Sequence, residues 1–468
     1  MRNKFKLLLK DTFIFAVGSI GSKIILFFLV PFYTAYLTTE EYGISNLVFT
    51  ISQFLIPIMS LEVFDAVLRF GLSKSYKKED VLKNAYLIIL FDVIISFLLF
   101  PILALYRPIK EWRIYLLIYF LASIINSTVM NYLKVCEKNK VYAGISIFQT
   151  IVLCIANIFL IAYLRIGIRG YLLSNIISLL ASSFVAFLFG NEWSAIKNGN
   201  INKFLMKEML LYSSPLILNS ISWWLISSSD KIMIERMVNT SELGVYTVAA
   251  KIPALINVLI AIFQQAWGIS SIKEIETSND TEFYSKTFKY YNIIVYTACI
   301  LALCGIRSFM KIYIQGGTNY QAASNYVPFL LVSAFFSAIS TFYGSLYTAL
   351  KKTDRIMVTT LIAGIVNVLV NYVAIRLIGT MGAVVGTVVA YLLTTIIRMT
   401  DMKNYIEIDI NYVKIIINWA LLFIFAFSVT ISNKDNMLVS GLFFVLYFIF
   451  NFNDVIMFFK SNPKVSEK

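Results

Sequence analysis

The chain has 468 residues, of which 59% are apolar and only 14% are charged. About 25% of the residues of a typical soluble domain are charged, so this composition excludes a set of soluble domains and indicates a protein that crosses a membrane many times. The 40 Lys and Arg residues exceed the 26 Asp and Glu residues. Histidine is absent from the sequence, which excludes His-dependent nucleophiles, His-ligated metals and His proton relays.

Apolar stretches long enough to cross a bilayer as helices, about 20 residues each, recur along the whole chain. We predict an all-α polytopic membrane protein with about 14 transmembrane helices. Twelve helices are the alternative, because serines and Asn219 interrupt the seventh apolar stretch. In addition, little polar sequence separates the last two stretches. The predicted spans are 11–36, 43–68, 84–106, 113–134, 142–164, 168–189, 208–229, 242–270, 287–310, 325–350, 356–376, 381–399, 412–432 and 437–459.

The distribution of positive charge predicts the orientation of these spans. With both termini in the cytoplasm, 27 Lys and Arg residues fall in cytoplasmic segments and 11 in outer ones, as the positive-inside rule requires. We therefore expect a multi-pass membrane protein with both termini in the cytoplasm. The loops are too short for a catalytic domain and no GxxxxGK[ST] phosphate loop is present. We expect neither enzymatic activity nor a cofactor, a catalytic residue, a bound metal or a nucleic-acid partner.

A short motif occurs once in each half of the chain. Residues 39–44 read Thr-Glu-Glu-Tyr-Gly-Ile, and residues 240–245, which lie 201 positions later, read Thr-Ser-Glu-Leu-Gly-Val. Each motif starts a predicted span with a capping box that ends at Glu41 or Glu242. Capping explains each motif locally but does not predict that it recurs half a chain later.

A glycine turn, Ile-Gly-x-x-Gly, recurs in the same way, at Gly167 and Gly170 and again at Gly379 and Gly382. The unit of repetition is therefore six spans, and an even number of spans makes the two repeats parallel. The predicted organisation is an N-lobe with spans 1–6 (1–190), a cytoplasmic linker (191–207), a C-lobe with spans 7–12 (208–400), and spans 13 and 14 with a cytoplasmic tail (401–468).

Two lysines lie inside predicted spans, Lys23 in the first and Lys251 in the eighth. A lysine at mid-membrane opposes insertion by about 2.5–3.5 kcal/mol, so such residues usually face an interior cavity or a partner. Facing a shared cavity, the two ammonium groups would bind the oxygens of a pyrophosphate. The alternative is ion pairing with carboxylates. Pro253 is expected to bend the eighth span beside Lys251.

Three carboxylates are candidates for gating or ion coupling. Asp65 and Arg69 are four residues apart, which predicts either a helical salt bridge at the cytoplasmic interface or a gate that opens. Asp92 in the third span is the preferred candidate for coupling to a proton or a sodium ion. Asp230 precedes Lys231, and this pair is interpreted as an outer interfacial pair or as a substrate contact.

Two adjacent tryptophans, Trp223 and Trp224, lie inside the Ser-rich seventh span near Asn219. Adjacent helical residues face about 100° apart, so one indole can line a cavity while the other packs. Aromatic faces stack on sugar rings, and Asn219 with the nearby serines can bond to hydroxyl groups. Core packing of both rings is the alternative.

The motif at 240–252 after Ser229-Asp230-Lys231, the motif at 39–43 after Pro31, and the two glycine turns resemble the Wzx-type polysaccharide flippases of the multidrug/oligosaccharidyl-lipid/polysaccharide exporter (MOP) superfamily. The resemblance covers the whole chain by topology. It implies two six-helix lobes in a V around a central cavity, and as substrate an oligosaccharide repeat unit on a polyprenyl pyrophosphate such as undecaprenyl pyrophosphate, destined for O-antigen, exopolysaccharide or another surface glycan.

The resulting expectation is a flippase that works by alternating access and is driven by a proton or sodium gradient. Its other partners would be membrane lipids, a polysaccharide polymerase and glycosyltransferases. A MATE-like multidrug antiporter is the alternative, although midplane lysines suit cationic drugs poorly. A membrane polymerase or ligase would need a large outer loop, and the segment between spans two and three gives no convincing major-facilitator motif.

Overall fold

The computed structural model describes residues 25–73, 75–277, 280–315, 317–432 and 437–460. Every regular element within these ranges is a helix, so the predicted all-α polytopic fold is confirmed. In the described part of the chain, ten helices are long and apolar enough to cross a membrane, and two bent helix pairs raise this number to twelve. The shorter apolar helices Ile25–Tyr36 and Gly441–Phe452 lie within the first and last predicted spans, so fourteen stays a prediction.

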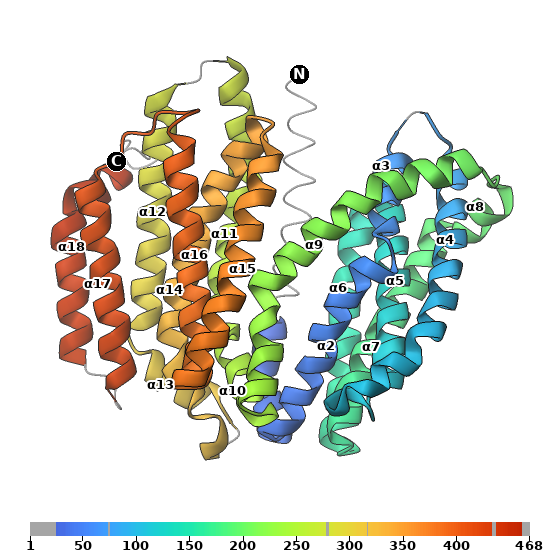
Figure 1. Cartoon of the computed structure of the whole chain (residues 1–468), viewed down its shortest axis with the longest axis horizontal. Helices are drawn as coiled ribbons and strands as arrows, with labels where there is room; N and C mark the ends of the chain where they lie inside the picture. The colour runs from blue at the N-terminus through green and yellow to red at the C-terminus, as the bar shows by residue number, and fades with distance from the viewer. Residues whose placement is uncertain (1–24, 74, 278–279, 316, 433–436, 461–468) are drawn as a thin grey trace. The chain divides into compact units, whose positions relative to one another are not determined.

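The chain forms two compact units, Met1–Ile232 and Met233–Lys468. The membrane-crossing helices of the first unit match the predicted spans in order (Figure 1). The elements that follow the helix Ile25–Tyr36 are α2 (Thr39–Met59), α3 (Val63–Gly71), α4 (Lys78–Leu99), η1 (Phe100–Leu105), η2 (Arg107–Ile109), α5 (Arg113–Val135), α6 (Asn139–Asn157), the π-helical turn η3 (Ile158–Tyr163), α7 (Gly167–Gly190), α8 (Glu192–Asn198) and α9 (Lys203–Met237).

The division between the units falls inside α9 and not in the segment 191–207. The cause is that α9 packs along the first unit: Tyr76 OH donates to Glu208 (2.5 Å), and Phe70 contacts Tyr212 edge-to-face. The short helix α8 in the predicted linker packs on α4 and α7 of the same unit.

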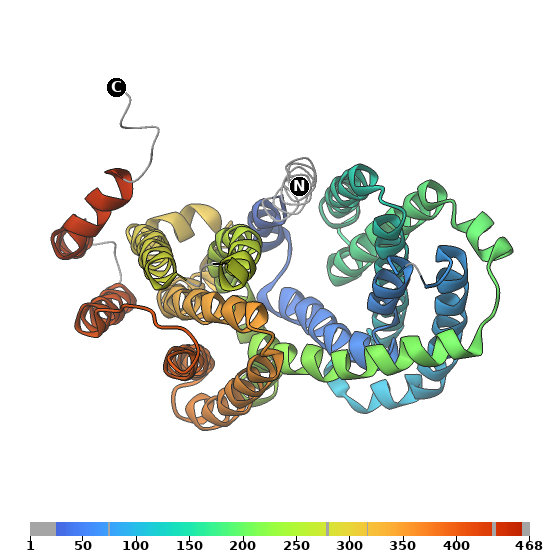
Figure 2. The same cartoon turned by 90° about the horizontal axis from the view of Figure 1, so that it is seen from above.

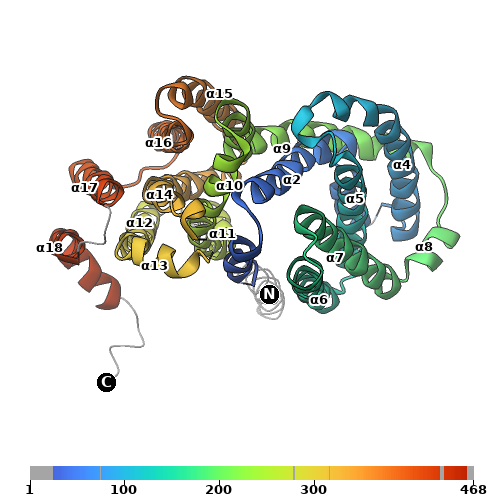
Figure 3. The same ribbon diagram turned by 90° about the horizontal axis from the view of Figure 1, so that it is seen from below.

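The second unit is organised around one buried helix, α14. Within the membrane-crossing stretch of α14, 72% of the residues are buried, and it contacts α10, α11, α12, α16 and α17 (Figure 3). Helices α17 and α18 lie side by side at the edge of this unit (Figure 2). The elements are α10 (Thr240–Ala249), α11 (Lys251–Thr277), α12 (Thr281–Leu303), α13 (Ile306–Tyr313), η4 (Gly317–Tyr320), α14 (Ala323–Ala349), α15 (Thr353–Ile378), α16 (Thr380–Met402), α17 (Tyr412–Ile431) and α18 (Met437–Lys460).

Two predicted spans are bent. The eighth bends by 40° between α10 and α11, directly before Pro253, as expected. Proline has no N–H to donate to the carbonyl oxygen of Ala249, four residues earlier, so the helix breaks there. The ninth span was predicted as one helix but bends by 65° between α12 and α13, because Gly305 adopts a left-handed φ of 80°.

The repeated motifs occupy matching positions in their units. Thr38 and Glu41 form the complete capping box at the start of α2, and Asn239 accepts a 2.7 Å hydrogen bond from the backbone N–H of Glu242 at the start of α10. The first glycine of each predicted turn has a positive φ, 52° at Gly167 and 61° at Gly379. This correspondence is what two parallel repeats of six spans would produce.

Candidate functional site

The second predicted span is broken, and the break holds a carboxylate. Helix α2 ends at Met59, and two consecutive non-glycine residues, Leu61 and Glu62, take left-handed φ angles of 49° and 53°. Such backbone costs roughly 1–3 kcal/mol per residue and is typical of functional sites. The break makes Glu62 the N-cap residue of α3 and buries it to 4% exposure. Its Oε1 accepts a 2.5 Å hydrogen bond from Ser220 Oγ of α9.

Asp65 lies one turn further along α3 and interacts electrostatically with Glu62. The predicted salt bridge between Asp65 and Arg69 is wrong: no ion pair joins these two described residues, and Arg69 is exposed. The strongest charge interaction of Asp65 is instead with Lys134 of α5, and its side chain bonds to Asn131. The reason is tertiary: α3 packs on α5, whose basic and amide groups face Asp65 while Arg69 points outward.

Asn131 holds this arrangement together, because its Nδ2 donates to the backbone oxygen of Phe64 (2.9 Å) and its Oδ1 accepts from Lys134 Nζ (3.1 Å). We call Glu62, Asp65, Asn131, Lys134 and Ser220 the N-unit polar cluster. It joins the broken second span to α5 and α9. Neither Lys134 nor Glu62 stands out as a site residue in the sequence, because no local pattern reveals its long-range partners.

The two tryptophans of α9 differ in their surroundings. Trp224 packs on Phe54 of α2 with ring centroids 4.7 Å apart, and its indole N–H donates to the backbone oxygen of Thr50 (2.9 Å). Trp223 is 43% exposed, and Asn219 is exposed on the same helix. Trp224 thus anchors α9 to α2, while Trp223 and Asn219 present accessible groups.

Asp92 of α4 is 1% exposed, and neither carboxyl oxygen has a hydrogen-bond partner among the described residues. One turn further on, Ser96 donates to the backbone oxygen of Asp92 (2.7 Å) and lines a small apolar cavity of about 140 Å³. Leu117 and Phe120 of α5 line the same cavity. An unpaired carboxylate is expensive to bury, and among the described residues Asp92 is the carboxyl group with both oxygens buried and without a hydrogen-bond partner.

Three predicted site residues remain: Lys251, Asp230 and Lys23. Lys251 is half-buried and begins α11 immediately after the 40° bend. Asp230 on α9 is buried, at 3% exposure, and its Oδ1 accepts from the backbone N–H of Lys231 (2.8 Å). Lys23 lies outside the described residues. Among the described residues, no group of three or more Cys, Asp or Glu side chains is placed to hold a metal ion.

The second unit contains a buried cation that was not predicted from the sequence. Arg398 of α16 is 4% exposed and donates to Thr359 Oγ1 (3.0 Å), Thr360 Oγ1 (2.9 Å) and the backbone oxygen of Ser340 (3.0 Å). From its position in the sequence, Arg398 is expected to be an ordinary residue at the cytoplasmic end of a helix. Its hydroxyl and carbonyl acceptors come from α14 and α15, which no sequence spacing links to position 398.

Comparisons with known proteins agree with this architecture. A family model described as polysaccharide biosynthesis protein matches residues 8–268, and one described as MatE matches residues 215–373. Lsg locus protein 1 of Haemophilus influenzae is 23% identical over 274 residues, which cover 55% of this chain and 64% of that protein, so the chain aligns with less than two thirds of that relative.

Two solved structures share the fold. The lipid II flippase MurJ in an inward closed conformation has a TM-score of 0.68 at 16% identity, with 95% of this chain and all of that chain covered. An inward-facing MATE family transporter of the MOP superfamily has a TM-score of 0.66 at 13% identity, with 82% and 95% covered. The resemblance stated from the sequence is confirmed: the chain belongs to the polysaccharide biosynthesis protein family and has the fold of the MOP transporters.

Proposed function

We propose that this chain is a flippase that carries an oligosaccharide repeat unit on a polyprenyl pyrophosphate from the cytoplasmic to the outer leaflet of the bacterial cytoplasmic membrane. The observation that carries the proposal is the family match over residues 8–268 on a helical transporter fold that aligns with the whole of the MurJ chain. The polytopic architecture supports a transporter that works without a catalytic domain.

Lys251 and Lys23 are the proposed contacts of the pyrophosphate. Lys251 lies at a helix bend in a span that the sequence places at mid-depth, where an ammonium group is costly unless it serves a partner. The diphosphate of the lipid-linked glycan is a partner of the right charge. Trp223 and Asn219, which are exposed on α9, are the proposed contacts of the glycan, and Trp224 holds that helix in place.

A cation gradient is the proposed source of energy, with carboxyl groups as carriers because the sequence has no histidine. Asp92 is the favoured proton carrier, since its carboxyl oxygens have no partner in the described residues and a proton removes the charge that burial penalises. Asp65 in the N-unit polar cluster is the second candidate. A carboxylate that bonds to Asn131 and interacts with Lys134 can change partners when the broken span moves, which is the behaviour of a gate.

The MATE-like alternative rests on the match of residues 215–373 to the MatE model. Cationic drugs need carboxylates in the binding cavity, whereas the charged residues in the interior of the first and eighth predicted spans, Lys23 and Lys251, are lysines. Export of a cationic dye is the activity that would separate this alternative from the flippase.

The proposal is tested in cells that carry this protein. Deleting it is expected to remove the surface polysaccharide and to leave lipid-linked repeat units on the cytoplasmic leaflet, and restoring it should reverse both effects. Polysaccharide at the normal level in the deletion strain, with no accumulated precursor, would exclude the proposed function.

A further inference from the structure

The segment that connects α7 to α9 packs against the first unit on one side and exposes aromatic and basic side chains on the other. Residues 193–207 contain three lysines and no acidic residue. Helix α8 lies at the outer edge of the unit, beside α4 and α7 (Figure 3). The pattern of positive charge predicts that this segment is cytoplasmic. We call its exposed side the connector face, which consists of Trp193, Lys197, Ile201, Lys203, Phe204 and Lys207.

Hydrogen bonds to α4 hold the connector in place. In the loop before α9, the backbone N–H groups of Asn200 and Asn202 donate to Asp80 Oδ1 (2.7 Å) and Asn84 Oδ1 (2.9 Å) of α4. Ile201, which lies between the two asparagines, is 61% exposed. The connector face is therefore a fixed surface on the first unit, with its apolar and basic side chains on the outside.

The positive charge of the connector face is not offset by nearby carboxylates. No ion pair within the described residues involves any of its three lysines. The acidic residues on either side of the segment have other partners, because Glu192 is buried and accepts from Tyr86 OH, and Glu208 accepts from Tyr76 OH. The adjoining residues 77–83 of α4 contain three lysines and two acidic residues, so they add no net negative charge.

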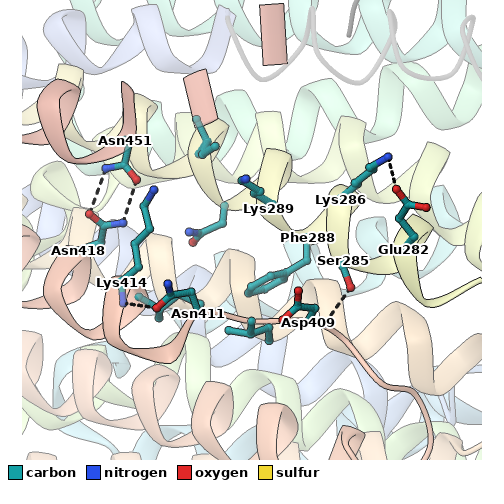
Figure 4. A pocket seen from close by; sticks show the side chains of 14 residues that line it. Glu282, Ser285, Lys286, Phe288, Lys289, Asp409, Asn411, Lys414, Asn418 and Asn451 are labelled. Carbon is teal, nitrogen blue, oxygen red and sulfur yellow. Dashed lines mark hydrogen bonds and ion pairs between the residues drawn. The ribbon is translucent and has the colours of Figure 1, made fainter. Parts of the chain in front are cut away.

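Lysines at another predicted cytoplasmic location have different surroundings. A pocket of about 680 Å³ between α12, α17 and α18 of the second unit is lined by three lysines but also by Glu282 and Asp409 (Figure 4). Lys286 Nζ pairs there with Glu282 at 2.5 Å. The pocket therefore has less excess positive charge than the connector face, which has no acidic member.

The apolar members of the connector face continue the exposed apolar surface of a membrane-crossing helix. The last turn of α7 exposes Leu188 by 58% and Phe189 by 56%. Trp193 follows on α8 at 73% exposure, and Phe204 on α9 at 64%. Large apolar groups beside lysines at the end of a span are typical of the headgroup region, where rings reach the acyl boundary and ammonium groups reach phosphates. A face turned to water would leave these rings hydrated.

We propose that the connector face binds the surface of the cytoplasmic leaflet and gathers anionic phospholipids there, such as phosphatidylglycerol. The rings of Trp193 and Phe204, together with Ile201, insert at the boundary between headgroups and acyl chains. The three lysines bind headgroup phosphates. This contact holds the start of α9, the helix in which the division between the two units falls, at the membrane surface. It does not depend on what the protein transports.

The test uses the full-length protein in nanodiscs of equal amounts of phosphatidylglycerol and phosphatidylcholine, with one of the two lipids brominated near the headgroup end of its acyl chains. Bromine quenches the fluorescence of tryptophans in contact with it, and the contribution of Trp193 is the difference between the wild type and Trp193→Phe. Trp193 is expected to be quenched by both lipids. Brominated phosphatidylglycerol should quench it at least about twofold more strongly, because the lysines enrich this lipid nearby.

Variants of the lysines identify the cause of this preference. In Lys197→Ala/Lys203→Ala/Lys207→Ala, the two brominated lipids should quench Trp193 equally, whereas arginine at the same three positions should keep the preference. The matched control, Lys286→Ala/Lys352→Ala/Lys403→Ala, removes the same charge from exposed lysines of the second unit that are also predicted to be cytoplasmic. It should give the same quenching of Trp193 as the wild type.

Three results would overturn the proposal. The first is that neither brominated lipid quenches Trp193, which would make the connector face a surface for water or for a protein partner. The second is equal quenching by the two lipids in the wild type, which would exclude selection of anionic lipid. The third is a preference for phosphatidylglycerol that persists in the triple alanine variant, which would exclude the lysines as its cause.

Discussion

Thr380 Oγ1 donates a 2.9 Å hydrogen bond to Glu242 Oε2, and this bond ties the first turn of α10 to the first turn of α16. In the first unit, the sequence-related Glu41 reaches the corresponding turn, since a Cβ added to Gly167 would lie 2.5 Å from Glu41 Oε1. Each glutamate thus connects the start of the second predicted span of its repeat to the start of the sixth.

Replacing Glu242 by alanine is expected to destabilise the second unit. Besides Thr380, Tyr326 OH donates to Glu242 Oε2 (2.8 Å), so two donors lose a charged acceptor, and the free energy of unfolding should fall by about 2–3 kcal/mol. Thermal unfolding in detergent checks this. The control, Glu407→Ala, removes an exposed carboxylate and is expected to have the melting temperature of the wild type. Equal melting of both variants would show that the Glu242 contacts contribute nothing.

Lys251→Ala is expected to abolish surface polysaccharide in cells while the protein stays folded and in the membrane. The ammonium group at the bend would no longer bind the pyrophosphate, so transport should fall by about tenfold or more. The same loss of surface polysaccharide is expected for Lys23→Ala. Polysaccharide is measured by immunoblot and protein level by tag detection, and Lys311→Ala, which removes an exposed lysine, is the control. Wild-type polysaccharide in both single variants would remove the lysines from the transport path.

Pro253→Ala tests whether the 40° bend between α10 and α11 serves transport. Alanine restores the N–H that can bond to the oxygen of Ala249, so the bend should relax. The free energy of unfolding should stay the same or rise, because a proline inside a helix costs about 3 kcal/mol. Transport is expected to fall, because Lys251 would change its direction. Pro328→Ala, in the buried helix α14, is the comparison. Unchanged transport by Pro253→Ala would mean that the bend has no role.

Glu192 gives a prediction about pH. It is fully buried on α8 and accepts a hydrogen bond from Tyr86 OH, and burial raises its pKa to about 7. A raised carboxyl pKa means that the folded state binds a proton more tightly than the unfolded one. The contribution of Glu192 to the stability is therefore fully present below about pH 4.5 and is lost as the pH rises through about 7. The loss is at most about 3 kcal/mol.

The measurement is the melting temperature of wild type and Glu192→Gln between pH 5 and pH 8.5. The wild type should lose stability over this interval and the glutamine variant should lose less, because glutamine does not titrate. Parallel curves for the two proteins would show that Glu192 is not the group responsible.

Local sequence signals predicted the elements of this fold well. Span positions follow from apolar length, the start of α2 from its Thr38–Glu41 capping box, and the bend at α11 from Pro253. The break at Leu61 and Glu62 was not predicted, because the sequence does not indicate which non-glycine residues adopt a left-handed backbone conformation. The partners of Asp65 were mispredicted for a related reason: spacing along one helix offers Arg69, whereas the fold supplies Asn131 and Lys134 from another.

Reconstitution into proteoliposomes tests the proposed function most directly. Purified protein would be given a fluorescent polyprenyl-pyrophosphate oligosaccharide in one leaflet, and its appearance in the other leaflet would be followed by quenching, with and without a proton or sodium gradient. Gradient-dependent translocation of the glycan lipid, without export of a cationic dye, is the predicted result. Export of the dye without translocation of the glycan lipid would contradict the account.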